Sequence, residues 1–347
     1  MRDATQKSLN QTEIGFFCSP IGLGHATRDV AIAEFLEKST TKFITGSGAA
    51  KLIGDYGFSV SDEYRPPNFD VQNGALQGSL GWLWKYYQYY KDCKKISLKF
   101  IDSENPKIIV SDEDFASLAI AQQKGIPSIL ITDILKTSFT RGISSIIERK
   151  MNKSMKEIIQ KCSVVIMPET GPDQNNIKRV GPIVRPISQS RDELRKKFSF
   201  ENKTIVASVG GTDAGKFLIE KTIEAVSKQK DLDLVLVSGP SLKIEYKNVR
   251  NLGFVNNLHE VIYASDLVIS LAGKSTIDES KAYGTPGIFI PIKGHFEQED
   301  NAKNEGYSFD DIFKLDSLIA QKIESKRVPM QTDGAKKASE IILQHLT

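Results

Sequence analysis

Small residues, a lysine and a carboxylate stand close together in the segment SLAGKSTIDES, residues 270–280. The apolar run Leu267–Ser270 predicts a buried strand, and the small residues Ala272–Thr276 predict the start of a helix. The first turn of a helix has backbone N–H groups without helical partners, and the helix dipole favours an anion there. Glu279 follows one turn later, where its carboxylate could accept two hydrogen bonds from a diol. A phosphate site followed by a carboxylate for a ribose is the combination that a nucleotide requires.

This segment and its continuation to residue 302 resemble the nucleotide-sugar signature of GT-B glycosyltransferases. They are most similar to the branch that includes the peptidoglycan lipid-intermediate N-acetylglucosaminyltransferase and the UDP-glycosyltransferases. The resemblance implies that Glu279 holds the nucleotide ribose and that Gln298, before Asn301-Ala302, contacts the donor sugar or its phosphates. The peptidoglycan enzyme usually has two glutamines at this place, and Glu297 stands for the first one here.

A glycine-rich turn near the N-terminus, Pro20–Arg28 (PIGLGHATR), joins a predicted strand to a predicted helix. A nicotinamide-binding fingerprint would need a third glycine where Thr27 stands and an acidic residue where Gly46 stands, so we reject that class of site. The resemblance instead implies that Gly24 and His25 open an acceptor-binding domain, with His25 as the general base. Histidine suits this role because its pKa lies near neutral pH. A histidine that only packs at the turn is the alternative.

Acidic residues follow the predicted strand Ile108–Val110 in the sequence SDED. We expect Asp112 to orient His25, because a carboxylate fixes the imidazole tautomer and supports the imidazolium. UDP-glycosyltransferases carry such an aspartate after the corresponding strand. Asp114 is the competing candidate, and capping of the next helix is the alternative for either acid.

Arg28 lies one turn into the first predicted helix. Its guanidinium could bind a phosphate of the acceptor, since arginine matches phosphate geometry. A position on the protein surface is the alternative.

A second glycine-rich run, Gly210–Lys216 (GGTDAGK), nearly matches a P-loop, but Phe217 stands where a Ser or Thr would bind magnesium. The resemblance implies another role, in which the loop lies near the donor diphosphate. It also implies that backbone groups near Phe254 pair with the base, and that His295 lies in a loop over the donor sugar. A core aromatic and a loop histidine without a role are the alternatives. The expected donor-binding residues are Gly211, Thr212, Phe254, Val255, Gly273, Lys274, Ser275, Thr276, Glu279, Glu297 and Gln298.

The tract Gly81–Phe100 combines aromatic residues with lysines. Trp82, Tyr86 and further residues recur at helical spacing, which is typical of a core stripe. Trp84 and Tyr87 widen the apolar surface beyond that stripe. Aromatic residues with lysines suit an anionic membrane surface or a sugar, so we expect Trp84 and Tyr87 on the acceptor side. Packing in the core is the alternative.

The elements that must position these residues alternate between short apolar strands and helical patterns, which predicts parallel α/β structure. The resemblance implies the GT-B fold, two doubly wound Rossmann-like domains facing each other across a cleft. We expect the acceptor domain at residues 1–185, the donor domain at 186–330, and a helix within 331–347 that packs back toward the first domain. Such sheets bind ligands at the carboxyl ends of their strands.

Length and composition bear on the number of domains, the partners and the compartment of the protein. The length of 347 residues favours two soluble domains. The net charge of +3 is too small to indicate nucleic-acid binding. Three widely spaced cysteines fit a reducing compartment, and no apolar run approaches about 18 residues. We expect a cytoplasmic protein, located at the inner face of the membrane if the aromatic tract meets lipid. The chain has no paired-aspartate motif, so we expect no metal and no cofactor besides the UDP-sugar substrate.

The resemblance therefore implies an inverting, UDP-sugar-dependent hexosyltransferase. It would move a hexose or N-acetylhexosamine to a hydroxyl or phosphate of an acceptor. A lipid-linked acceptor, a cell-envelope glycan and a small molecule are all compatible with the sequence. Two alternatives share the fold. A UDP-sugar 2-epimerase would form its product without an acceptor, and a non-catalytic nucleotide-sugar-binding subunit would bind UDP but release none.

Overall fold

The computed structural model describes residues 11–77, 79–138, 145–209, 215–229, 231–239, 246 and 249–346. The chain divides into two compact units. The first contains the chain up to Pro67, Ser79–Ile183 and the segment from Asp333 onward, and the second contains Asn68–Gly78 and Val184–Thr332.

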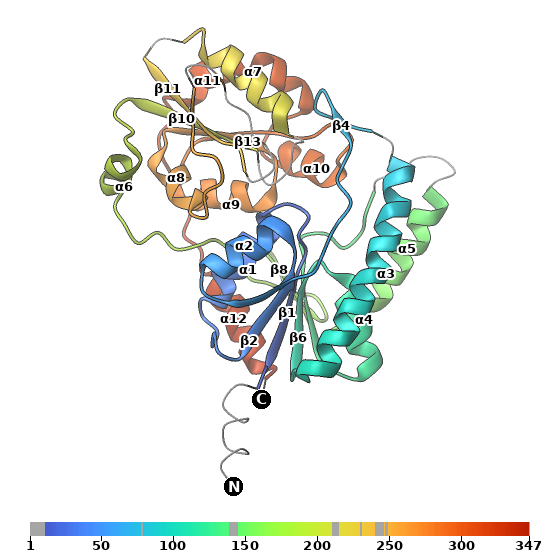
Figure 1. Cartoon of the computed structure of the whole chain (residues 1–347). Helices are drawn as coiled ribbons and strands as arrows, with labels where there is room; N and C mark the ends of the chain where they lie inside the picture. Colours follow the sequence, from blue (N-terminus) through green and yellow to red (C-terminus); the bar gives the residue numbers. More distant parts are fainter. Residues whose placement is uncertain are drawn as a thin grey trace. The chain divides into compact units, whose positions relative to one another are not determined.

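A parallel sheet forms the centre of the first unit (Figure 1). Its strand order is β3-β2-β1-β6-β7-β8-β9. Strands β1, β6, β7 and β8 are buried along their whole length, which explains why these short runs are almost entirely apolar. The strands are β1 (Ile14–Cys18), β2 (Thr41–Thr45), β3 (Ser59–Asp62), β6 (Ile108–Asp112), β7 (Ser128–Ile131), β8 (Val164–Met167) and β9 (Ile177–Arg179).

Helices of the first unit pack on this sheet in two groups. Helix α4 contacts both α3 and α5, whereas α1 contacts α2 and α12, so the last helix belongs to this unit. The helices are α1 (Gly24–Ala33), α2 (Ser47–Asp55), α3 (Ser79–Glu104), α4 (Phe115–Lys124), α5 (Ser145–Lys161) and α12 (Gly334–Gln344).

The second unit has its own parallel sheet, with the order β12-β11-β10-β13-β14. Its strands are β10 (Lys203–Ser208), β11 (Leu232–Val237), β12 (Arg250–Asn251), β13 (Leu267–Leu271) and β14 (Gly287–Ile290). Its helices are α6 (Arg191–Phe198), α7 (Lys216–Val226), α8 (Leu258–Ala264), α9 (Lys274–Tyr283), α10 (Phe296–Asn304), the 3₁₀ helix η3 (Phe309–Lys314) and α11 (Leu315–Lys322).

A short hairpin, β4 (Val71–Gln72) with β5 (Ala75–Leu76), packs on the second unit although it precedes α3 in the chain. Its turn, Asn73-Gly74, has φ of 49° and 73°, the pair of positive values that a tight hairpin turn requires. The Leu76 N–H donates to the Lys293 carbonyl at 2.8 Å, and the Lys293 N–H donates to the Gly74 carbonyl at 2.9 Å. The continuous first domain expected at 1–185 therefore differs from the structure at residues 68–78.

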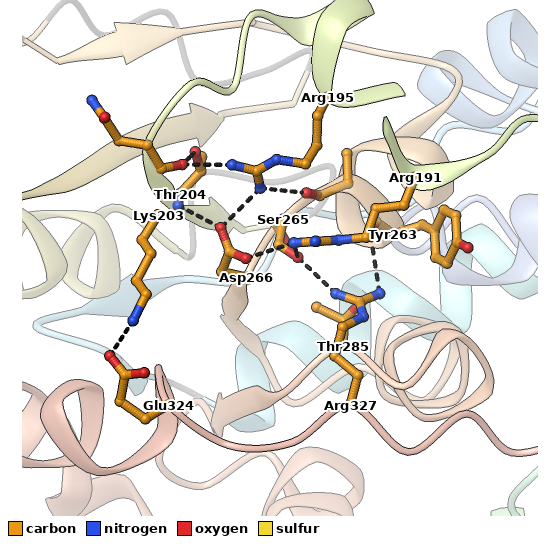
Figure 2. Close-up of polar contacts among 12 residues, drawn as sticks. Arg191, Arg195, Lys203, Thr204, Tyr263, Ser265, Asp266, Thr285, Glu324 and Arg327 are labelled. Carbon is orange, nitrogen blue, oxygen red and sulfur yellow. Dashed lines mark hydrogen bonds and ion pairs between the residues drawn. The ribbon is translucent and has the colours of Figure 1, made fainter. Parts of the chain in front are cut away.

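Arginine side chains of the second unit cluster at the amino ends of β10 and β13 (Figure 2). Asp266 accepts hydrogen bonds from Arg191 at 2.5 Å, from Arg195 at 2.9 Å and from the Thr204 N–H at 2.8 Å. Arg327 donates to the carbonyl of Ser265 and to other oxygens nearby. Ligands of parallel sheets bind at the opposite, carboxyl edge, so the role of this cluster is structural. It holds α6 and the segment around Arg327 against the sheet of the second unit.

Candidate functional site

The turn after β1 positions His25. Gly22 has φ of 83°, a left-handed conformation that glycine adopts without a steric penalty. Helix α1 begins at Gly24, so His25 lies in its first turn, at the carboxyl edge of the sheet. The side chain of His25 is 16% exposed, so its ring is largely but not fully buried.

Asp112 is the last residue of β6 and pairs in register with Cys18, the last residue of β1. This register brings its carboxylate to α1, where Asp112 Oδ1 lies 2.9 Å from His25 Nδ1. Arg28 Nη2, which only donates, lies 3.2 Å from the same nitrogen. Because the ionised Asp112 carboxylate only accepts and is the nearer partner, we assign the proton to Nδ1, and the Nε2 lone pair then faces away from Asp112. The structure thus brings together the histidine and the aspartate that the sequence paired.

Arg28 differs from both expectations, because it lies neither on the surface nor free for an acceptor phosphate. Its side chain is 3% exposed, and it donates from Nε to Asp112 Oδ2 at 2.8 Å and from Nη2 to Asp112 Oδ1 at 2.6 Å. Nη1 also lies 3.6 Å from Asp133 Oδ1. Residues three apart share one face of a helix, so Arg28 reaches the same carboxylate as His25.

These contacts change the acid–base chemistry of the pair. Burial by itself would raise the pKa of Asp112, but Arg28 and His25 outweigh it and hold that pKa far below its ordinary value. Burial opposes the charged form of His25, yet the neighbouring Asp112 more than compensates and the pKa of His25 is raised. Asp112 is therefore ionised, and His25 is a stronger base than a free histidine.

Glu113 is a residue of this site that the sequence did not single out. Its φ of 56° lies in the left-handed region, which costs a non-glycine residue roughly 1–2 kcal/mol. Its Oε1 accepts from Thr132 Oγ1 at 2.9 Å, and its Oε2 lies 3.8 Å from His25 Nε2. Residues forced into strained conformations cluster at functional sites. Nothing in the letters SDED reveals that strain.

Asp114, the competing candidate, is the N-cap of α4. Its side chain accepts from the backbone N–H groups of Ala116 at 3.2 Å and Ser117 at 3.3 Å, and from the hydroxyl of Tyr64 at 2.7 Å. The capping alternative therefore holds for Asp114 and not for Asp112.

Among the described residues, His25, Asp112 and Glu113 form the one group of His, Cys, Asp and Glu side chains close enough to share a metal ion, with ligand atoms within 4.8 Å. Arg28 already donates to both oxygens of Asp112. A cation bound there would face a fixed guanidinium, so these residues fit a metal poorly.

In the second unit, α9 begins where the sequence predicted the start of a helix. Gly273 is the N-cap, and Lys274 begins the helix. Lys274 Nζ donates to Asp278 Oδ1 at 2.5 Å, which folds the lysine along its own helix. Ser275 and Thr276 are half-buried in the same first turn.

Glu279 is less open than the sequence suggested. Its side chain is 4% exposed, and its Oε1 accepts from Arg185 Nε at 2.9 Å. Arg185 also donates to the Asn256 carbonyl at 2.7 Å, and its own carbonyl accepts from Tyr283. Prolines flank Arg185 in the sequence, and sequence reasoning did not single it out as a buried partner of Glu279. A ribose would share the Glu279 carboxylate with this arginine.

The other donor-side residues fall into three groups. Gln298 Oε1 accepts from the Ile292 N–H at 3.1 Å, which leaves its amide nitrogen to donate to a ligand. Val255 packs against the core, and Phe254 and Glu297 are half-buried. Gly211 and Thr212 lie outside the described residues.

His295 lies against the hairpin. Its ring centroid is 5.4 Å from that of Phe69, and burial lowers the pKa of His295 to about 4. The imidazole is therefore neutral at physiological pH.

The aromatic tract lies within α3, and its side chains form a buried set and an exposed set. Cys93 is buried, and Tyr89 packs against the same core cluster. Trp84 and Tyr87 are 64% and 47% exposed, and Lys91 Nζ lies 4.5 Å from the centre of the Tyr87 ring. No helix in the described part of the chain is both long and apolar enough to span a bilayer.

Comparisons with known proteins bear on the family and the fold of the chain. Residues 205–315 match the glycosyltransferase family 28 C-terminal domain. An uncharacterized glycosyltransferase of Methanosarcina acetivorans is 27% identical over 322 residues, which cover 84% of this chain and 83% of the relative. The UDP-N-acetylglucosamine–N-acetylmuramyl-(pentapeptide) pyrophosphoryl-undecaprenol N-acetylglucosamine transferase of Caldicellulosiruptor saccharolyticus is 26% identical over 328 residues, which cover 85% and 83% of the two chains.

Solved structures show the same fold. The glycotransferase of kitacinnamycin aligns with a TM-score of 0.64 at 12% identity, covering 96% of this chain and 99% of its own. MurG of Acinetobacter baumannii aligns with a TM-score of 0.59 at 13% identity, covering 96% and 99%. At such identities the likeness speaks for the fold, and it confirms the predicted GT-B architecture.

Proposed function

We propose that this chain, a glycosyltransferase of the GT-B fold that resembles MurG and the UDP-glycosyltransferases, transfers a hexose or N-acetylhexosamine from a UDP-sugar to a hydroxyl group with inversion. The observation that carries the proposal is the hydrogen bond between His25 Nδ1 and Asp112 Oδ1 at the carboxyl edge of the first sheet. It leaves Nε2 as a basic atom for an incoming hydroxyl.

His25 would act as the general base. As the acceptor oxygen attacks the anomeric carbon, its proton moves to Nε2, and the bond between that carbon and the UDP oxygen breaks. A direct displacement of this kind inverts the anomeric configuration. Asp112 supports the resulting imidazolium, and Arg28 keeps Asp112 ionised and fixed in place.

The second unit would bind the donor. The start of α9, with Gly273 through Thr276, offers backbone N–H groups and the positive end of the helix dipole to the diphosphate. In this proposal Glu279 binds the ribose, Gln298 donates to the sugar or its phosphates, and the backbone near Phe254 pairs with the base. Gly211 and Thr212 would complete the diphosphate site. The leaving diphosphate would then need no metal, because these groups supply the positive potential.

The acceptor is proposed from the surface of α3. The Caldicellulosiruptor saccharolyticus relative is named for transfer to a pyrophosphoryl-undecaprenol carrier. Exposed Trp84 and Tyr87 with the lysines of α3 would suit a lipid-linked acceptor at the inner face of the membrane, with the protein otherwise in the cytoplasm.

One assay tests the reaction class. The purified protein is incubated with individual UDP-sugars, with and without lipid-linked or glycan acceptors, and release of UDP is measured. The proposal expects release that depends on an acceptor and a glycosylated product with the opposite anomeric configuration. A new UDP-sugar formed without an acceptor would instead indicate a 2-epimerase, and UDP-sugar binding without any release would indicate a non-catalytic subunit.

A further inference from the structure

The hairpin β4–β5 bears on how the second unit binds the sugar of its donor. We propose that this hairpin is part of the donor-sugar site, because it fixes loop 292–295, which leads to the donor-side residue Gln298. The inference rests on the proposed function, because that function assigns Gln298 to the donor. It goes further in assigning Gln298 to the sugar rather than to its phosphates.

Loop 292–295 lies at the edge of the sheet where ligands of parallel sheets bind. It follows the carboxyl end of β14 and leads into α10. Two contacts tie these elements to the start of α9. The Ala272 N–H donates to the Ile290 carbonyl at 3.1 Å, and Asn301 Nδ2 donates to the Ala272 carbonyl at 3.2 Å. The loop is therefore a neighbour of the proposed diphosphate site, which is where the sugar of a UDP-sugar would lie.

The hairpin binds the loop through both backbone polar groups of one residue. The Lys293 N–H donates to the Gly74 carbonyl at 2.9 Å, and the Leu76 N–H donates to the Lys293 carbonyl at 2.8 Å. The preceding residue of the loop is held by α10, because Gln298 Oε1 accepts from the Ile292 N–H at 3.1 Å. The hairpin and Gln298 thus fix neighbouring peptide groups, so displacement of the hairpin would also disturb Gln298.

The turn of the hairpin fits closely against the second unit. A Cβ atom on Gly74 would lie 2.9 Å from Phe309 Cε2 and 3.0 Å from Phe217 Cδ1, so a side chain there would have to displace a ring. Both aromatic residues pack against the hydrophobic core of the unit. Before the turn, the ring of Phe69 contacts that of His295, with the centroids 5.4 Å apart. The hairpin therefore holds the loop by a side chain as well as by its backbone.

The charges at the start of α10 suit sugar hydroxyls better than phosphate. Glu297 and Glu299 lie in the first turn of this helix, and the lysine of the loop, Lys293, lies over the ring of Phe309. His295 is neutral, because burial lowers its pKa to about 4. Carboxylates repel a phosphate but accept hydrogen bonds from hydroxyls. We therefore assign this loop and helix start to the sugar, with the diphosphate at α9.

The variant Gly74→Ala tests the contribution of the hairpin. The added methyl group meets the two rings and strains a backbone with φ of 73°, so the docked hairpin becomes less populated. Calorimetry without acceptor measures binding of UDP and of a UDP-sugar that the wild type transfers. The dissociation constant of the UDP-sugar should rise about 5- to 30-fold, which corresponds to the strain, because the sugar needs the docked state. That of UDP should change less than about twofold, because UDP is assigned to groups outside the loop.

Hydrogen exchange measures displacement of the hairpin without any donor. The Lys293 N–H is bonded to the Gly74 carbonyl, so a peptide covering residues 291–296 should exchange faster in Gly74→Ala than in the wild type. Gly306→Ala is the matched control. Gly306 belongs to the same unit and has φ of 82°, but a Cβ atom there would have no atom of a non-adjacent described residue within 4 Å. It should keep the wild-type exchange of the loop and the wild-type affinity for both ligands.

A second variant, Phe69→Leu, leaves the turn of the hairpin unaltered and removes the ring contact with His295. It should raise the dissociation constant of the UDP-sugar about 2- to 10-fold, the range for one aromatic pair, and leave that of UDP unchanged. This variant decides the question if Gly74→Ala does not fold, and wild-type affinity for the UDP-sugar in Phe69→Leu would then overturn the inference.

Three results for a folded Gly74→Ala would overturn the inference alone. They are unchanged exchange of the loop, faster exchange with equal losses of affinity for UDP and UDP-sugar, and faster exchange with no loss for either ligand. In each case acceptor-dependent UDP release by the wild type persists, so the proposed function stands. Absence of that release from the wild type with every UDP-sugar would instead contradict the proposed function and remove the basis of the inference.

Discussion

Arg28 and Asp112 form a buried two-point ion pair, with Nε 2.8 Å from Oδ2 and Nη2 2.6 Å from Oδ1. The side chains are 3% and 0% exposed, so the pair is shielded from solvent. Because both carboxylate oxygens are engaged, Asp112 cannot rotate away from His25. Arg28 is therefore a positioning residue, one step behind the proposed base.

Removing Arg28 should cost both stability and turnover. Arg28→Ala leaves a buried carboxylate without its main counter-charge, which typically destabilises a protein by about 3–5 kcal/mol. Urea unfolding followed by circular dichroism measures this difference. Arg65→Ala is the control, since the pair of Arg65 with Asp62 is largely exposed and should contribute less than about 1 kcal/mol. Equal losses in both variants would show that the buried pair has no special role.

The pH dependence of kcat/KM should follow the raised pKa of His25. Burial lowers the pKa of His25, but the neighbouring Asp112 raises it by more. Asp133 raises this pKa further, and Arg28 lowers it. The base acts only when unprotonated, so activity should be lost as pH falls through a midpoint above the ordinary histidine value of about 6.5. Asp112→Asn should move this midpoint to lower pH, because it removes the charge that stabilises the imidazolium. If the midpoint does not move in Asp112→Asn, the loss of activity at low pH belongs to a group other than His25.

Glu279→Gln should weaken UDP binding by roughly 1–3 kcal/mol, the range for hydrogen bonds to a charged group. Titration calorimetry with UDP gives the number directly. The substitution keeps the shape of the side chain but removes the charge opposite Arg185, so a thermal melt must show that the variant remains folded. Glu224→Gln, on the exposed face of α7, should bind UDP like the wild type. Wild-type affinity in Glu279→Gln would remove the ribose assignment.

The exposed aromatic residues of α3 should bring the protein to anionic membranes. Trp84 and Tyr87 expose apolar area, and each lysine near such a surface contributes about 1 kcal/mol. Flotation with anionic vesicles at low salt should carry the wild type upward, and the double variant Trp84→Ala/Tyr87→Ala should float less. Phe313→Ala removes a residue that is 61% exposed in the second unit and should behave as the wild type. A wild type that stays in the dense fraction with every lipid mixture would contradict this prediction.

The sequence predicted the regular parts of the fold because short buried strands are almost wholly apolar and stand out between amphipathic helices. The β6 and β13 runs and the start of α9 appear close to the predicted positions. It did not predict that the hairpin of residues 68–78 packs on the second unit, because a hairpin signal such as Asn73-Gly74 names a turn and not its docking surface.

The candidate site was predictable where a residue type and its place after a strand imply a role. His25 follows β1 and Asp112 ends the adjacent strand β6, so their approach could be anticipated. The roles of Arg28 and Arg185 could not be anticipated. In a sequence, a buried arginine cannot be told from a surface arginine until its carboxylate partner is known. Glu113 depends on a backbone conformation that leaves no trace in the sequence.

Turnover of His25→Ala tests the central claim most directly. With a UDP-sugar and an acceptor that the wild type uses, we expect kcat to fall about 10²–10⁴-fold, the usual contribution of a general base. UDP affinity by calorimetry should stay within about twofold of the wild type, because the donor is assigned to the second unit. A His25→Ala variant that turns over at a rate comparable to the wild type would contradict the assignment of His25 as the base.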